Sequence, residues 1–163
     1  MEAITILLPA EAFKKLKRLA EAEDKSLEEL VGEAIFRQLG ITDPQAKAEL
    51  HLKLCEKYLK EAEEFLAKGD YVQASEKAWG ASSQMLKALA AKEGKELRSH
   101  ADLWKYMDIL AEKLGDDELR HLWRTANALH QNFYENWMPP REVKLSIKDV
   151  KTFIKRLKEL FKT

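Results

Sequence analysis

The segment RHLWRTANALHQNFYENWMPP, residues 120–140, contains the side chains of this chain that are best suited to chemistry. Within it Arg124, Asn127 and His130 follow one another at steps of three, so on a helix each can touch the next. An imidazole exchanges protons near neutral pH, and a guanidinium binds anionic groups through a fork of N–H donors. These three residues are therefore the candidate site.

Helix geometry keeps Arg124 and His130 apart within one chain. They are separated by about 120° around the helix axis and by about 9 Å along it. Side chains lean toward the helix N-terminus, which carries Arg124 farther from His130. The two can meet across a two-fold axis, where the same helix of a second copy runs antiparallel. A composite site of this kind requires a homodimer.

The same residues have a structural interpretation. His130 lies about 40° from the centre of an apolar stripe, where a histidine is more often a core residue hydrogen-bonded to a neighbour. An arginine on a helix is usually solvated, and many helices contain this spacing by chance. Spacing alone favours the structural interpretation. The stripe consists of Leu119, Leu122, Ala126, Leu129, Phe133 and Trp137.

Other residues are candidate RNA contacts. Arg120 and Tyr134 lie on the same predicted helix, where Tyr134 either stacks on a base or packs against the protein. His100 lies at a predicted helix start, where an exposed residue with no further role is the favoured alternative. Lys151 and Lys155 belong to the basic run KDVKTFIKRLKELFK, which is the best candidate for a phosphate-backbone patch, although such a run is usually a solvated helix face.

Composition restricts the classes of function. The 163 residues include 28 Lys and Arg against 28 Asp and Glu, so nucleic-acid binding requires a local basic patch. The many charged residues fit the ion-pair networks of heat-adapted proteins. Cys55 is the single cysteine, which points to a reducing cytoplasm. No run is long and apolar enough to span a bilayer, and no signal peptide, metal motif or nucleotide motif is present, so we expect no membrane, metal or cofactor.

From residue 44 onward the chain reads as helical. Asp43 before Pro44 is a helix start, and glycines mark the ends of the first three predicted helices. The last helix is predicted to open at Ser146, which forms an S-x-x-D pattern with Asp149. Short connections between the helices predict an antiparallel five-helix bundle. The predicted helices cover residues 44–68, 70–94, 99–115, 116–139 and 146–163.

The N-terminal residues 1–40 form a separate pattern. ITILLP predicts a short strand that ends at Pro9, and two helical patterns follow, the second opened by Ser26 with Glu29 and closed by Gly40. A lone strand requires a partner strand. This unit resembles the ribbon-helix-helix fold, in which two chains pair their strands and DNA-binding members read the major groove. Its outward residues would be Ala3, Thr5 and Leu7, with six basic against eight acidic residues in the unit, which favours dimerisation without DNA reading.

The helical region also resembles a known superfamily. The residues GDYVQASEKAWGASSQMLKALA, ELRSHADLW and LRHLWRTANALHQNFYENWMPP resemble the HEPN superfamily of small helical bundles and, more closely, its archaeal PaREP family. The resemblance covers residues 44–163 and leaves out the first forty. It implies a helical bundle that works as a dimer. Many HEPN proteins are metal-independent endoribonucleases, and others are non-catalytic binding modules.

The resemblance assigns roles to individual residues. Arg124 matches the signature arginine and would bind the phosphate, and His130 matches the signature histidine and would be the acid or base. Asn127 would orient the site. Active members often have Asn, Asp or His directly after the arginine, whereas this chain has Thr125 there. Three functions follow for a cytoplasmic homodimer: an RNA-cleaving enzyme, a non-catalytic nucleic-acid-binding or adaptor module on the same fold, and a DNA-binding regulator acting through residues 1–40.

Overall fold

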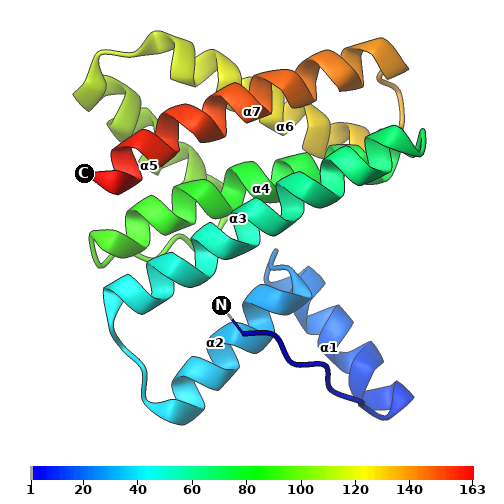
Figure 1. The fold of residues 1–163 in the computed structure, drawn as a ribbon, viewed down its shortest axis with the longest axis vertical. Coiled ribbons are helices and arrows are strands. Elements are labelled where there is room, and N and C mark those ends of the chain that lie inside the picture. The colour runs from blue at the N-terminus through cyan, green and yellow to red at the C-terminus, as the bar shows by residue number, and fades with distance from the viewer. Residues whose placement is uncertain (1) are drawn as a thin grey trace.

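The computed structural model describes residues 2–163, which form seven α-helices and, within that range, no β-strand. The fold is mainly α, as predicted. In Figure 1 the helices from α3 to α7 form a bundle, and the shorter helices α1 and α2 project from one side of it. The pair comprises α1 (Ala10–Ala22) and α2 (Leu27–Leu39). The bundle comprises α3 (Pro44–Ala67), α4 (Tyr71–Lys92), α5 (His100–Leu114), α6 (Asp117–Glu135) and α7 (Pro140–Lys162).

Helix α4 is the central helix of the bundle because it packs against α3, α5, α6 and α7. Most of its residues are buried, and many of them are alanine or serine. Small side chains let neighbouring helices approach closely. At Gly80 an added Cβ would lie 3.3 Å from the ring of Tyr58 on α3, so the glycine fits a close crossing of the two helices.

The structure contains the helix caps that were predicted from short, local sequence patterns. The side chains of Ser26, Asp43, Asp70, Ser99 and Asp116 each accept a hydrogen bond from a backbone N–H in the first turn of a helix. Gly40 adopts the left-handed conformation with φ 67°, which ends α2. These local contacts confirm the predicted ends of α2 and α5 and the starts of α2 to α6.

The predicted strand is absent from residues 2–9, so the ribbon-helix-helix interpretation is not supported. A strand requires backbone hydrogen bonds to a second strand, and residues 2–163 offer none. Pro9 instead directly precedes α1. With no ribbon, Ala3, Thr5 and Leu7 do not form the outward face of a ribbon.

The junction between α6 and α7 also differs from the prediction. Helix α6 ends at Glu135 because Asn136 turns left-handed and the side chain of Asn132 accepts hydrogen bonds from the backbone of Trp137 and Met138. Helix α7 then begins at Pro140, six residues before the predicted start, since proline is well suited to the first helical position. Ser146 is therefore a buried residue within the helix.

The four tryptophans differ in how far they are buried. Trp79 and Trp123 are buried, but Trp104 is 41% exposed and Trp137 is 51% exposed. Trp137 follows the end of α6, so the helical stripe that predicted its burial does not reach it. None of the helices in the described range 2–163 is both long and apolar enough to cross a membrane.

A buried polar network connects the helix pair to the bundle. The side chain of Glu29 on α2 is 2% exposed and accepts hydrogen bonds from Lys87, at 2.8 and 3.0 Å, and from Gln84, at 2.8 Å, both on α4. The other end of the Gln84 amide lies 2.7 Å from Nδ1 of His51 on α3. Glu29 was expected to close a helix cap with Ser26; its side chain instead fixes α2 on the bundle.

Candidate functional site

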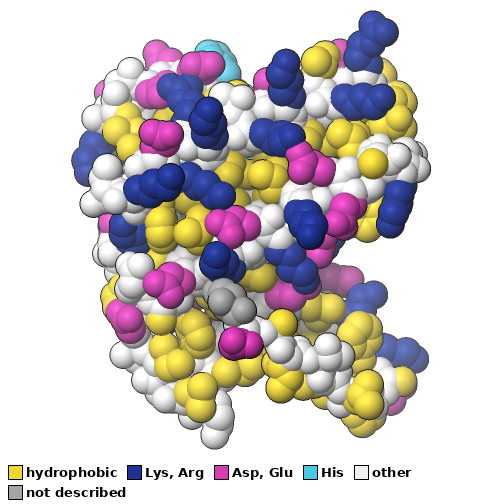
Figure 2. Space-filling view, viewed as in Figure 1, with side chains coloured by type: hydrophobic (Ala, Val, Ile, Leu, Met, Phe, Trp, Pro, Cys, Tyr) yellow, Lys and Arg dark blue, Asp and Glu magenta, His cyan; other side chains and the backbone are white. Residues whose placement is uncertain are grey.

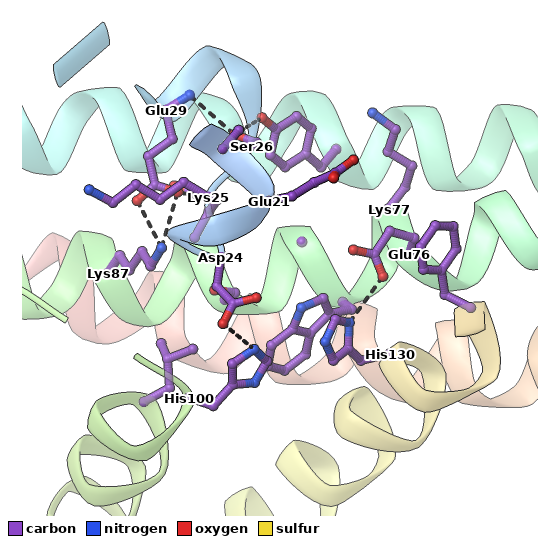
Figure 3. A pocket seen from close by; sticks show the side chains of 18 of the residues that line it. Glu21, Asp24, Lys25, Ser26, Glu29, Glu76, Lys77, Lys87, His100 and His130 are labelled. Atoms are coloured by element: carbon purple, nitrogen blue, oxygen red, sulfur yellow. Dashed lines mark hydrogen bonds and ion pairs between the residues drawn. The ribbon is translucent and has the colours of Figure 1, made fainter. Parts of the chain in front are cut away.

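A cavity lies between the α1–α2 pair and the bundle, and we call it the histidine cleft. It has a volume of about 750 Å³. Its walls come from the turn between α1 and α2, one face of α4, the start of α5 and the last turns of α6. Figure 3 shows Asp24 directed toward His100 and Glu76 directed toward His130, each pair joining two different elements.

Two histidines lie together in this cleft. The ring of His130 on α6 stacks on that of His100 at the start of α5, with their centroids 5.1 Å apart and their planes 27° apart. Both rings also stack on Trp79 of α4, at centroid distances of 4.6 and 5.6 Å. Tyr134 approaches the edge of His130 at 5.3 Å. The result is an aromatic cluster that opens into a cavity.

Each histidine has its own carboxylate (Figure 3). Nδ1 of His130 lies 3.0 Å from a carboxylate oxygen of Glu76 on α4. Nε2 of His100 lies 3.4 Å from a carboxylate oxygen of Asp24 in the turn between α1 and α2. A carboxylate beside one ring nitrogen fixes the orientation of the imidazole and leaves the other nitrogen available. Each imidazole therefore has one nitrogen free for a ligand.

The electrostatic environment at the aromatic end is negative. Burial raises the pKa of the Tyr134 hydroxyl, and the nearby charges of Glu76, Asp24 and Glu21 raise it further. The cleft as a whole is lined by five acidic and four basic side chains. Among the basic ones, Lys77 is paired with Glu61 at 2.5 Å.

The predicted triad does not assemble within one chain. Arg124 is exposed, has no ion-pair partner within residues 2–163 and does not line the cleft, in agreement with the helical geometry. The Asn127 side chain donates a hydrogen bond of 2.8 Å to the carbonyl of Trp123, one turn earlier, so it does not orient His130 here. The side chain that contacts the ring nitrogen of His130 is that of Glu76.

The other predicted contacts divide between the cleft and the surface. His100 and Tyr134 line the histidine cleft. Arg120 is held by three carboxylates, those of Asp108, Glu112 and Asp117. On α7, Lys151 is paired with Glu63 and Lys155 is exposed. Figure 2 shows basic side chains interspersed with acidic ones on this face, with no single basic patch.

Sequence reasoning missed Glu76, Trp79 and Asp24 as parts of the site. Glu76 and Trp79 are 54 and 51 residues away from His130 in the chain, so no local spacing relates them. Trp79 is buried and also forms part of the cleft wall. No group of three His, Cys, Asp or Glu side chains in residues 2–163 is arranged to hold a metal ion.

The sequence profile of the archaeal PaREP1/PaREP8 family matches residues 50–154, which is more than half of the chain. The chain belongs to this family. The PaREP1/PaREP8 match includes Glu76, Trp79, His100 and His130 and leaves out Asp24. The histidine cleft therefore combines a family bundle with one wall from outside the matched range.

A solved structure is also similar to this chain. A crystal structure of a protein from Sulfolobus solfataricus is 31% identical to this chain, with a TM-score of 0.57. The alignment covers 65% of this chain and 94% of that one. No curated protein matches.

Proposed function

We propose that this PaREP1/PaREP8 protein is a metal-independent endoribonuclease of the HEPN type, with the histidine cleft as its active site. One observation carries the proposal: His100 and His130 are stacked 5.1 Å apart at a cavity, each with its own carboxylate. Cleavage of RNA through its own 2′-hydroxyl requires one base and one acid and no metal. Two imidazoles can provide both groups.

In this proposal His130 is the base and His100 is the acid. Nδ1 of His130 donates to Glu76, so its Nε2 is the nitrogen that can take the proton of the 2′-hydroxyl. The 2′-oxygen then bonds to phosphorus and the bond to the 5′-oxygen breaks. His100 then gives a proton to the departing 5′-oxygen. Trp79 and Tyr134 offer aromatic faces to unstacked bases.

A homodimer would add Arg124 to this site. Arg124 is exposed outside the cleft, so only the Arg124 of a second copy could bind the phosphate there. Exposed apolar side chains in the first 39 residues support self-association, since soluble monomers rarely expose large apolar patches. Ile4 is 83% exposed and Leu7 is 95% exposed. The lower part of the molecule in Figure 2 shows this apolar surface.

The test is cleavage of a mixed-sequence RNA in excess chelator. We expect the parent protein to cleave, and His130→Ala and His100→Ala each to lower the rate by at least about 100-fold, which is typical of a lost acid or base. His121→Ala, an exposed histidine on the same helix, is the matched control and should keep the parent rate.

Other outcomes separate the alternatives. Binding of RNA by the parent without cleavage would assign the fold to the non-catalytic module. Cleavage that survives in both folded histidine variants would contradict the proposed active site. Arg124→Ala beside Arg141→Ala, two exposed arginines, tests the composite site, since only the first should lower the rate.

A further inference from the structure

A second cavity lies next to the histidine cleft, and we call it the linker cavity. It has a volume of about 460 Å³ and is lined by the second half of α2, the 41–44 linker, the start of α3 and the loop before α5. Glu29, Lys87 and Arg98 line both cavities. The two are therefore neighbours along α2, with the buried network between them.

The two cavities differ in charge. The histidine cleft has more acidic than basic lining residues, whereas the linker cavity has five basic and three acidic ones. Within residues 2–163, Arg37 and Lys47 have no carboxylate at ion-pair distance and are exposed, so both are free to bind an anion. In contrast, Lys87 is occupied by Glu29, and Arg98 is paired with Glu96 at 2.9 Å.

The linker cavity also contains an aromatic side chain. Phe36 of α2 is half-buried and forms part of its wall, one turn before the linker. Proteins that bind single-stranded nucleic acid combine cations along the backbone with aromatic faces on which bases stack. Arg37, Lys47 and Phe36 provide both kinds of group.

We propose that the linker cavity binds the sugar-phosphate backbone of the same single-stranded RNA whose scissile linkage lies in the histidine cleft. The inference rests on the proposed function and adds the path of the strand. Arg98 lies where the two cavities meet, so its guanidinium marks the passage between them. This path differs from the predicted patch on α7, because Lys151 and Lys155 line neither cavity.

The experiment compares two double charge reversals. Arg37→Glu with Lys47→Glu changes the linker cavity, and Lys151→Glu with Lys155→Glu makes the same change in net charge on α7. The probe is a fluorescein-labelled mixed-sequence RNA of about 12 nucleotides, which is long enough to extend from the histidine cleft into the linker cavity. It is titrated at several salt concentrations against proteins that also carry His130→Ala, which prevents cleavage. Circular dichroism and thermal unfolding verify the fold.

We expect the linker-cavity reversal to weaken binding at least tenfold, and the α7 reversal to weaken it less than threefold, because only the first loses phosphate contacts. The salt slope of log Kd should fall by about 1.4 for two lost contacts on a single strand. In proteins that retain His130, cleavage of a dinucleotide, which reaches only the histidine cleft, should change less than twofold.

Two results would overturn the inference. Equal weakening by both reversals, with RNA still bound by the parent, would remove the linker cavity from the path and leave the proposed function intact. No binding of the RNA by the parent at any salt concentration would overturn both proposals together.

Discussion

At the residue scale, the buried polar network of Glu29, Gln84 and His51 determines which protonation state of His51 fits the folded protein. Its Nδ1 donates to the Gln84 carbonyl, and the Gln84 amide donates to Glu29. Burial lowers the pKa of His51 below its ordinary 6.5, and the hydrogen bond to Gln84 only partly offsets this. The neutral imidazole is therefore the form that fits the folded protein.

This shift predicts a pH dependence of stability. Between the lowered pKa of the folded state and about 6.5, the unfolded chain binds more protons at His51 than the folded chain does. The free energy of unfolding should therefore decrease as the pH falls through that window. His51→Gln, which keeps a donor for Gln84, should show a shallower decrease in urea unfolding measured from pH 7.5 to 5.5. If its slope equals that of the parent and of the exposed control His121→Gln, the assignment is wrong.

At the element scale, the α1–α2 pair is held on the bundle by polar as well as apolar contacts. Besides the Glu29 network, the Tyr58 hydroxyl on α3 donates to Glu28 and also contacts Ser26, at 2.6 Å. Since the turn between α1 and α2 carries Asp24 to His100, the position of this pair determines one wall of the histidine cleft.

Removing one partner of the Glu29–Lys87 pair should be costly. Glu29→Ala leaves the ammonium of Lys87 buried without a counter-ion, so we expect the free energy of unfolding to decrease by about 3–5 kcal/mol. The double variant Glu29→Met, Lys87→Met removes both charges and should lose less. Glu11→Ala, from an exposed pair with Lys14, should change stability by less than about 1 kcal/mol in the same urea titration. A double variant as unstable as the single one would refute this account.

The elements also show how far the sequence could predict the structure. Caps such as Ser26 and Asp43 act within three residues, so the sequence alone located most helix ends. The prediction of a strand in the N-terminal residues was wrong because the stability of a strand depends on a partner strand. The predicted start of α7 was wrong because Pro140 and Ser146 both resemble helix starts, and only packing selects between them. For the candidate site, helical spacing predicted His130. Glu76 and Asp24 lie on other elements, and no local sequence pattern relates them to His130.

At the scale of the whole molecule, the proposed dimer predicts the mass in solution. Light scattering after size exclusion should give about twice the 18.8 kDa of one chain. Ile4→Glu with Leu7→Glu should shift the protein toward the monomer, because the exposed apolar surface near the N-terminus would then carry charge. Leu145→Glu, an exposed leucine on α7, is the control and should leave the mass unchanged. A parent protein of single-chain mass would exclude the dimer at that concentration.

Because Trp79 stacks on both histidines, its fluorescence should report on the state of the histidine cleft. A protonated imidazole in contact with an indole quenches its fluorescence more strongly than a neutral one. The emission of this tryptophan, taken as the difference between the parent and Trp79→Phe, would therefore follow the proton occupancy of the two rings. A base inserted beside the cluster would alter the same signal, so ligands could be screened by light alone, with no label attached.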